Sequence, residues 1–197
     1  MEHGLVDKAK ASGVWSGEWP EYRLVIPAED PACSQVREWR QQWQAAYGKE
    51  YVSQKPPGIT LACWRAREEM EETMIRWIGN LASQTSRFEV ILNNFSGIPP
   101  QLLYIRVQEE EPFRQITRLL RPLLERVNDH DHQVRLFERP FIQLGKLPAA
   151  EGPKQWLQHT HQLFHAAFTA QHLVLYRHAG DEHKKIGLFP FRTDWTA

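Results

Sequence analysis

Pro57-Gly58-Ile59-Thr60-Leu61 recurs in altered form as Pro140-Phe141-Ile142-Gln143-Leu144. Each segment enters a short apolar strand through proline and carries a polar residue, Thr60 or Gln143, between two apolar residues. The two segments lie about half the predicted ordered length apart. A matched pair at this spacing predicts a duplicated architecture whose halves face each other across a central cleft.

Hydrophobic periodicity predicts the same order of elements on both sides of the chain's middle. The first half reads as strand 22–26, helix 32–47, strand 59–64, helix 66–81, and strands 88–94 and 102–107. The second half reads as strand 102–107 again, helix 112–124, strand 139–146, helix 153–164, and strands 171–177 and 185–191. Pro122 is expected to kink or shorten its helix.

These units predict an α+β fold made of two β-α-β-α-β-β lobes with pseudo-two-fold symmetry. Two antiparallel-rich sheets would line the cleft, and the helices would pack outside. Residues 1–20 are interrupted by glycine, serine and proline and are expected to form a weakly ordered lead-in. Residues 21–197 then form a single bilobal domain with intimately associated lobes.

Composition limits the classes of function. The 197 residues include 24 basic and 24 acidic side chains, so the chain lacks the overall basic charge typical of nucleic-acid-binding proteins. A local basic groove is still allowed. The two cysteines, Cys33 and Cys63, provide neither a disulfide framework nor zinc-ligand spacing. With no apolar run of membrane-spanning length and no signal-peptide pattern, we expect a soluble cytoplasmic protein without a membrane partner.

The segments 55–61 and 139–146, together with the strand ending at Ile26-Pro27, resemble the two-histidine (2H) phosphoesterase superfamily, which includes 2′-5′ RNA ligase-like proteins and cyclic phosphodiesterases. In that family each segment reads histidine, apolar residue, Thr or Ser, apolar residue. One histidine acts as general base and the other protonates the leaving oxygen, because imidazole titrates near neutrality. The two hydroxyls bind the phosphate.

Carried over by position, Gly58 and Phe141 stand where the histidines would be, and neither can transfer a proton. Thr60 is retained, and the Gln143 amide can still donate a hydrogen bond. The resemblance therefore implies a degenerate protein with no catalytic residue at these positions. It would bind a nucleotide, an RNA end or another phosphorylated ligand in the cleft, without a cofactor.

Candidate ligand-binding residues are Gly58, Thr60, Phe141, Gln143, Lys55, Arg139 and Lys146. The three basic residues flank the segments and could present a positive field to an anion, although solvated loop charges are the commoner arrangement. Thr60 also suits an ordinary strand position. Phe141 either fills the core or stacks on a base.

Two histidine groups stand outside the segments. His130 and His132 lie in a polar run, and His161 and His165 have i,i+4 spacing on the predicted fourth helix. Without an H-E-x-x-H pattern we expect solvated histidines and no metal.

Two alternatives remain open: an active phosphoesterase with replaced catalytic groups, and a protein-interaction module that exposes some of the eight tryptophans. The sequence leaves it uncertain whether the protein is an enzyme.

Overall fold

The computed structural model describes residues 19–98, 102–127, 134–148, 163–179 and 182–193. Its helices are α1 (Ala32–Tyr47), α2 (Glu71–Gln84) and α3 (Glu111–Val127), with single 3₁₀ turns at Lys49–Tyr51 and Glu68–Met70. Its strands are β1 (Glu21–Pro27), β2 (Gly58–Arg65), β3 (Phe88–Ile98), β4 (Leu102–Val107), β5 (Arg135–Leu136), β6 (Phe141–Gly145), β7 (His165–Ala170), β8 (His172–Ala179) and β9 (Glu182–Pro190).

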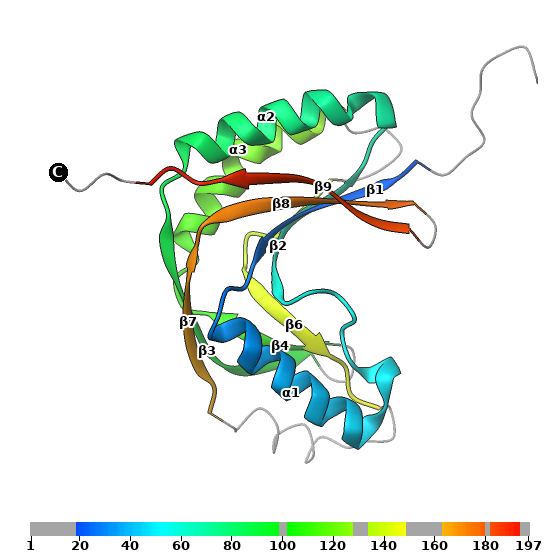
Figure 1. The fold of residues 1–197 in the computed structure, drawn as a ribbon, viewed down its shortest axis with the longest axis vertical. Helices are drawn as coiled ribbons and strands as arrows, with labels where there is room; N and C mark the ends of the chain where they lie inside the picture. The colour runs from blue at the N-terminus through cyan, green and yellow to red at the C-terminus, as the bar shows by residue number, and fades with distance from the viewer. Residues whose placement is uncertain (1–18, 99–101, 128–133, 149–162, 180–181, 194–197) are drawn as a thin grey trace, which may run out of the picture.

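The strands form one curled antiparallel sheet in the order β7-β3-β4-β6-β2-β1-β8-β9, with β5 beside β2 (Figure 1). We call β2, β1, β8 and β9 the β1 lobe, and β6, β4, β3 and β7 the β4 lobe. The lobes meet at a seam between β2 and β6, where the registered pair is Ile59 with Ile142. The predicted α+β class is confirmed, and the two expected sheets are joined edge to edge at this seam.

The predicted duplication extends to the register of the strands. In each half the first strand pairs antiparallel with the strand that carries the matched segment. The equivalent pairs are Ile26 with Ile59 and Ile105 with Ile142, then Val25 with Thr60 and Tyr104 with Gln143. The matched segments therefore occupy equivalent places on the two sides of the seam.

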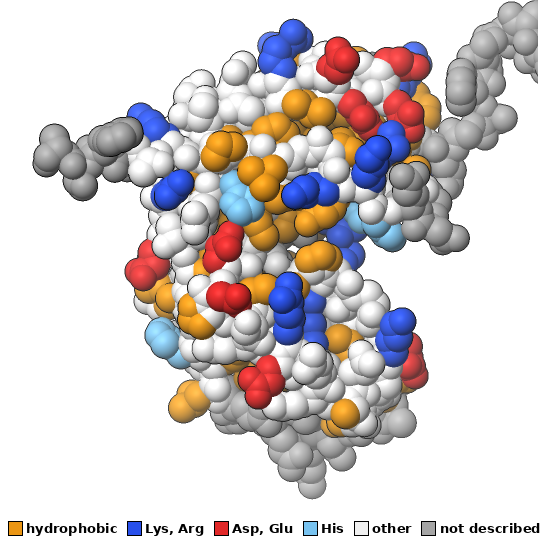
Figure 2. Space-filling model, viewed as in Figure 1, with side chains coloured by type: hydrophobic (Ala, Val, Ile, Leu, Met, Phe, Trp, Pro, Cys, Tyr) orange, Lys and Arg blue, Asp and Glu red, His pale blue; other side chains and the backbone are white. Residues whose placement is uncertain are grey.

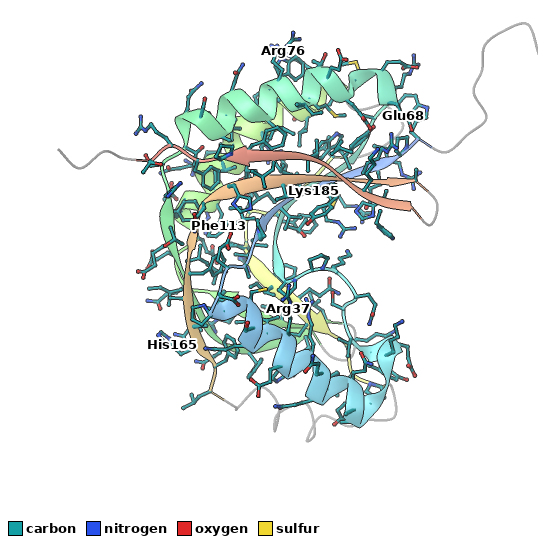
Figure 3. The ribbon with its side chains drawn as sticks, viewed as in Figure 1. Arg37, Glu68, Arg76, Phe113, His165 and Lys185 are labelled. Carbon is teal, nitrogen blue, oxygen red and sulfur yellow. The ribbon has the colours of Figure 1, made fainter. Side chains whose placement is uncertain are left out.

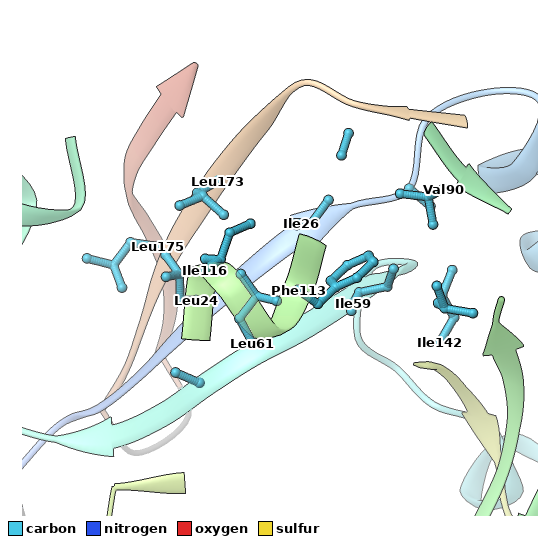
Figure 4. Packing of buried hydrophobic residues seen from close by; sticks show 14 of the residues in the cluster. Leu24, Ile26, Ile59, Leu61, Val90, Phe113, Ile116, Ile142, Leu173 and Leu175 are labelled. Carbon is cyan, nitrogen blue, oxygen red and sulfur yellow. The ribbon is translucent and has the colours of Figure 1, made fainter. Parts of the chain in front are cut away.

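Helices cross between the halves. α1 follows β1 in the chain but packs against β6 and β7, whereas α3 follows β4 but packs against β2 and α2. Figure 4 shows Phe113 and Ile116 of α3 lying over Leu24, Ile26 and Ile59 of the β1 lobe. Each half of the sheet thus depends on a helix from the other half for its apolar cover.

Two predicted elements need correction. Pro122 does not shorten α3, which carries the predicted stripe of Phe113, Ile116, Leu120 and Leu124 in the core and continues to Val127. Burying each such side chain stabilises the fold by about 1.5–3 kcal/mol, and together these gains offset the roughly 3 kcal/mol cost of an internal proline.

The predicted helix 153–164 falls mostly outside the described residues, as does the lead-in up to residue 18. Its continuation to His165 is wrong, because His165 begins β7, an edge strand paired with β3. Ala166, Phe168 and Ala170 alternate as its buried residues, so the period of two was already present in the sequence.

Candidate functional site

The matched segments lie at the centre of the sheet, and their four variable positions share one face. Ile59 and Ile142 are fully buried in the core, so the residues beside them, Thr60, Phe141 and Gln143, project from the opposite, half-buried face. Because β2 and β6 run antiparallel through the seam, Thr60 lies toward Phe141 and Gly58 toward Gln143. Figure 2 shows the surface hollowed between the two lobes, and we call this hollow the cleft.

Gly58 is crowded by β1. A Cβ atom at this position would lie 2.8 Å from Cγ1 of Val25 and 2.9 Å from the backbone oxygen of Ile26. Real Cβ atoms essentially never approach other heavy atoms so closely. An imidazole therefore has no room at position 58 unless the β1–β2 pair separates.

Phe141 has a different surrounding. Its ring lies 5.0 Å from the ring of Tyr104, the residue opposite Gln143 on β4. This tilted aromatic pair is half-buried and forms part of the cleft face of the β4 lobe. Position 141 thus supplies an apolar aromatic surface and no proton donor or acceptor.

Arg40 of α1 ties the two segments together. Its Nη1 donates to the backbone oxygen of Lys55 at 2.5 Å, and its Nη2 donates to that of Gln143 at 2.6 Å. The side chain is buried, and desolvation lowers its pKa to about 10, so it remains charged at neutral pH. One guanidinium therefore fixes the approach to β2 relative to β6.

The three predicted basic residues lie in different places. Lys55 is exposed in the segment before β2, and burial of its ammonium first, then the charge of Arg23 on β1, lower its pKa. Lys146 is exposed and its Nζ lies 5.6 Å from the ring of Tyr51. Arg139 is exposed in the loop before β6. The pKa of Lys55 is thus lowered in part by the positive charge of a second residue, Arg23.

Sequence reasoning missed Arg23. It lies two residues from Val25 on β1, on the same face as Thr60, and it pairs with Cys63 on β2 and Tyr176 on β8. The signal was available, because Tyr22, Leu24 and Ile26 alternate as core residues and leave Arg23 on the opposite face. Burial raises the pKa of the Cys63 thiol, so it is not an activated nucleophile.

His178 and His183 were also missed. They are cross-strand partners on β8 and β9, and their rings contact each other through the Nδ1 atoms. Desolvation first, then Arg23 and His183, lower the pKa of His178 from its ordinary value of 6.5 to about 4. His178 is therefore neutral at physiological pH.

The predicted histidine groups do not form a metal site in the described part of the chain. His165 lies on the outer edge strand β7, away from the cleft (Figure 3), and the helical pairing with His161 is wrong because His165 is a strand residue. His130, His132 and His161 lie outside the described residues. Within those residues, no three His, Cys, Asp or Glu side chains are placed to hold a metal ion.

None of the described helices is long and apolar enough to cross a membrane.

A curled antiparallel sheet in which two equivalent segments pair at the centre defines a class of α+β proteins built from two similar halves. The sequence profile described as "2′-5′ RNA ligase superfamily" matches residues 28–182. The chain therefore belongs to the 2′-5′ RNA ligase superfamily of 2H phosphoesterases. Comparison with curated protein sequences gave no match.

Solved structures share this fold at low sequence identity. TT0787 of Thermus thermophilus has a TM-score of 0.67 at 14% identity and covers 88% of this chain and 99% of its own. A crystallised phosphoesterase has a TM-score of 0.62 at 17% identity, with 88% and 99% coverage. E. coli LigT complexed with phosphate has a TM-score of 0.60 at 15% identity, with 89% and 99% coverage. Other LigT structures contain ATP, NADP+ or 3′-AMP.

Replacing Gly58 by alanine is expected to destabilise the fold by about 1–3 kcal/mol, because the added Cβ overpacks the β1–β2 pair. Urea denaturation measures the change, and Gly79→Ala is the control, since a Cβ there meets only Phe189 at 3.7 Å. Equal stabilities of Gly58→Ala and the wild type would contradict the crowding.

Arg40→Met is expected to lower the free energy of unfolding by about 1–3 kcal/mol, because two backbone carbonyls lose a charged donor. Arg40→Lys should not restore the loss, since an ammonium lacks the fork that spans both oxygens. Arg37→Ala, on the exposed side of α1, should stay within about 0.5 kcal/mol of the wild type when both are measured by urea denaturation.

Stability should fall between pH 6.5 and pH 4 in a manner that depends on His178. The unfolded chain takes up a proton at His178 as the pH falls below 6.5, while the folded chain takes it up only near 4. Stability that is complete above pH 6.5 is therefore lost across this window. His178→Gln should flatten the dependence measured by urea unfolding at pH 7 and pH 5, and exposed His165→Gln should leave it unchanged.

Proposed function

We propose that this protein is a catalytically inactive member of its superfamily that binds a nucleotide, an RNA end or another phosphorylated small molecule in the cleft. The observation that carries the proposal is the contrast between the four matched positions. Thr60 and Gln143 project from one face of the seam with hydrogen-bonding groups, whereas positions 58 and 141 hold no acid or base.

The crowding at Gly58 supports the loss of catalysis. The family reaction needs a base and an acid on opposite sides of the phosphate, each contributing about 10²–10⁴-fold. Here one position has no space for a side chain and the other holds Phe141 against Tyr104. The phosphate-binding groups can remain useful without these two, because binding needs only donors directed at the anion.

Nucleotide binding is supported by the described surface and by the relatives. The Phe141–Tyr104 pair offers a face on which a base can stack, and stacking is typically worth about 1–3 kcal/mol per base. LigT, which has the same fold, is crystallised with phosphate and with three nucleotides. We infer that phosphate meets Thr60 and Gln143 while the base lies toward the β4 lobe.

Calorimetric titration with 3′-AMP tests binding. Thr60→Val and Gln143→Leu should each weaken it about tenfold, as expected for the loss of a hydrogen bond to a charged group. Thr169→Val, at an exposed position of β7, is the matched control and should bind like the wild type. Absence of binding by the wild type would remove the proposal.

Incubation with 2′,3′-cyclic AMP, followed by chromatography, tests the inactivity separately. No turnover is expected. Hydrolysis that disappears in Thr60→Val would instead establish the alternative of an active phosphoesterase with replaced groups.

A further inference from the structure

Arg23 is a buried cation without a matching anion. It is 8% exposed, lies on the cleft face of a central strand, and its Nε has no hydrogen-bond partner. In the described part of the chain it forms no ion pair. Buried charges are normally paired, because desolvating an unpaired charge is costly.

A second cation lies beside it. The ammonium of Lys55 is partly desolvated, and the proximity of Arg23 further lowers its pKa. Glu21 is the carboxylate on the same face of β1, and its charge acts to raise the pKa of Lys55, but within the described residues it forms no ion pair with either cation. Two cations with one neighbouring carboxylate that forms an ion pair with neither leave a net positive charge, which favours a bound anion.

The strand geometry sets the distance from this pair to the seam. Thr60 lies opposite Val25, and Arg23 is two residues further along β1 on the same face. Two residues of an extended strand span about 7 Å. The backbone of Arg23 is therefore about one nucleotide's length away from that of Val25, opposite Thr60.

We propose that Arg23 and Lys55 bind a second phosphate of the cleft ligand, an inference that rests on the proposed function. The first phosphate lies at Thr60 and Gln143, and the second lies against the β1 lobe. The ligand class is then a nucleotide or RNA end that carries two phosphates on either side of one ribose. An arginine fork can hold such a group through two parallel hydrogen bonds, and the lysine adds a point charge.

Other residues on the cleft face of the β1 lobe also suit a phosphate group. Tyr176 lies opposite Arg23 on β8 and presents a hydroxyl, which can donate to a phosphate oxygen. Lys185 pairs with Tyr176 from β9, and Figure 3 places it beside the β8–β9 hairpin. Its neighbour Lys184 pairs with Arg177 and projects from the opposite face, toward α2.

Two probes that differ by one phosphate test the inference. Titration calorimetry compares 3′-AMP with adenosine 3′,5′-bisphosphate at two salt concentrations. The wild type should bind the bisphosphate about tenfold more tightly, with the steeper dependence on salt. In Lys55→Ala the ratio of the two affinities should fall to near one. Lys184→Ala removes the same charge from the opposite face and should keep the wild-type ratio.

The outcomes separate this inference from the proposed function. If neither probe binds, both fail. If the wild type binds both probes equally, binding in the cleft stands but the second phosphate site does not exist. If Lys184→Ala lowers the affinity ratio as much as Lys55→Ala, the preference for the bisphosphate comes from the overall positive charge of the lobe. That result would overturn a phosphate site at Arg23 and Lys55. Arg23→Gln adds a second variant, used after circular dichroism shows that it is folded.

Discussion

The two hydrogen bonds from Arg40 hold the centre of this protein in register. The seam between the lobes has one registered pair, Ile59 with Ile142. This single pair does little to fix the relative positions of the two matched segments. The guanidinium adds a rigid fork that spans the oxygens of Lys55 and Gln143. The relative position of the two matched segments therefore depends on a helix that follows β1 closely in the chain. A buried arginine is tolerated here because both of its terminal nitrogens, Nη1 and Nη2, donate to backbone oxygens.

The two positions that the family resemblance assigns to histidine, 58 and 141, have different physical surroundings. At position 141, Phe141 occupies a space that another ring could fill, since its neighbour is the side chain of Tyr104. At position 58 the obstacle includes the backbone oxygen of Ile26, which cannot move without separating β1 from β2. Position 58 is thus confined by backbone, whereas position 141 is bordered by a side chain. Introducing an imidazole would require the backbone to move at position 58, but only a change of side-chain packing at position 141.

The fold was more predictable than the site, because its information is local and periodic. Alternation predicted the first part of β3, runs of strand-forming residues predicted β1 and β2, and helical spacing predicted α1 with its observed bounds. β7 was missed because His165–Ala170 was partly absorbed into a helical reading of the preceding histidines. The charged residues of the candidate site are far apart in the sequence and come near one another only when the strands pair. The effect of Arg23 on Lys55, for example, depends on the β1–β2 register. Arg40 was hidden for the same reason, because its acceptors meet only in the folded chain.

A zero net charge conceals an uneven distribution across the β1 lobe. Arg23 and Arg177 lie on the neighbouring strands β1 and β8 but project from opposite faces. Arg177 lies within 3.3 Å of Glu68 and 3.2 Å of Glu71, so the helix-covered face neutralises its arginine. On the cleft face, the charges of Arg23 and of the acid Glu21 both act on Lys55, so two cations face one carboxylate. Because Glu68 and Glu71 gather on the side that α2 covers, a chain with equal numbers of acidic and basic residues can still direct a local field at an anion.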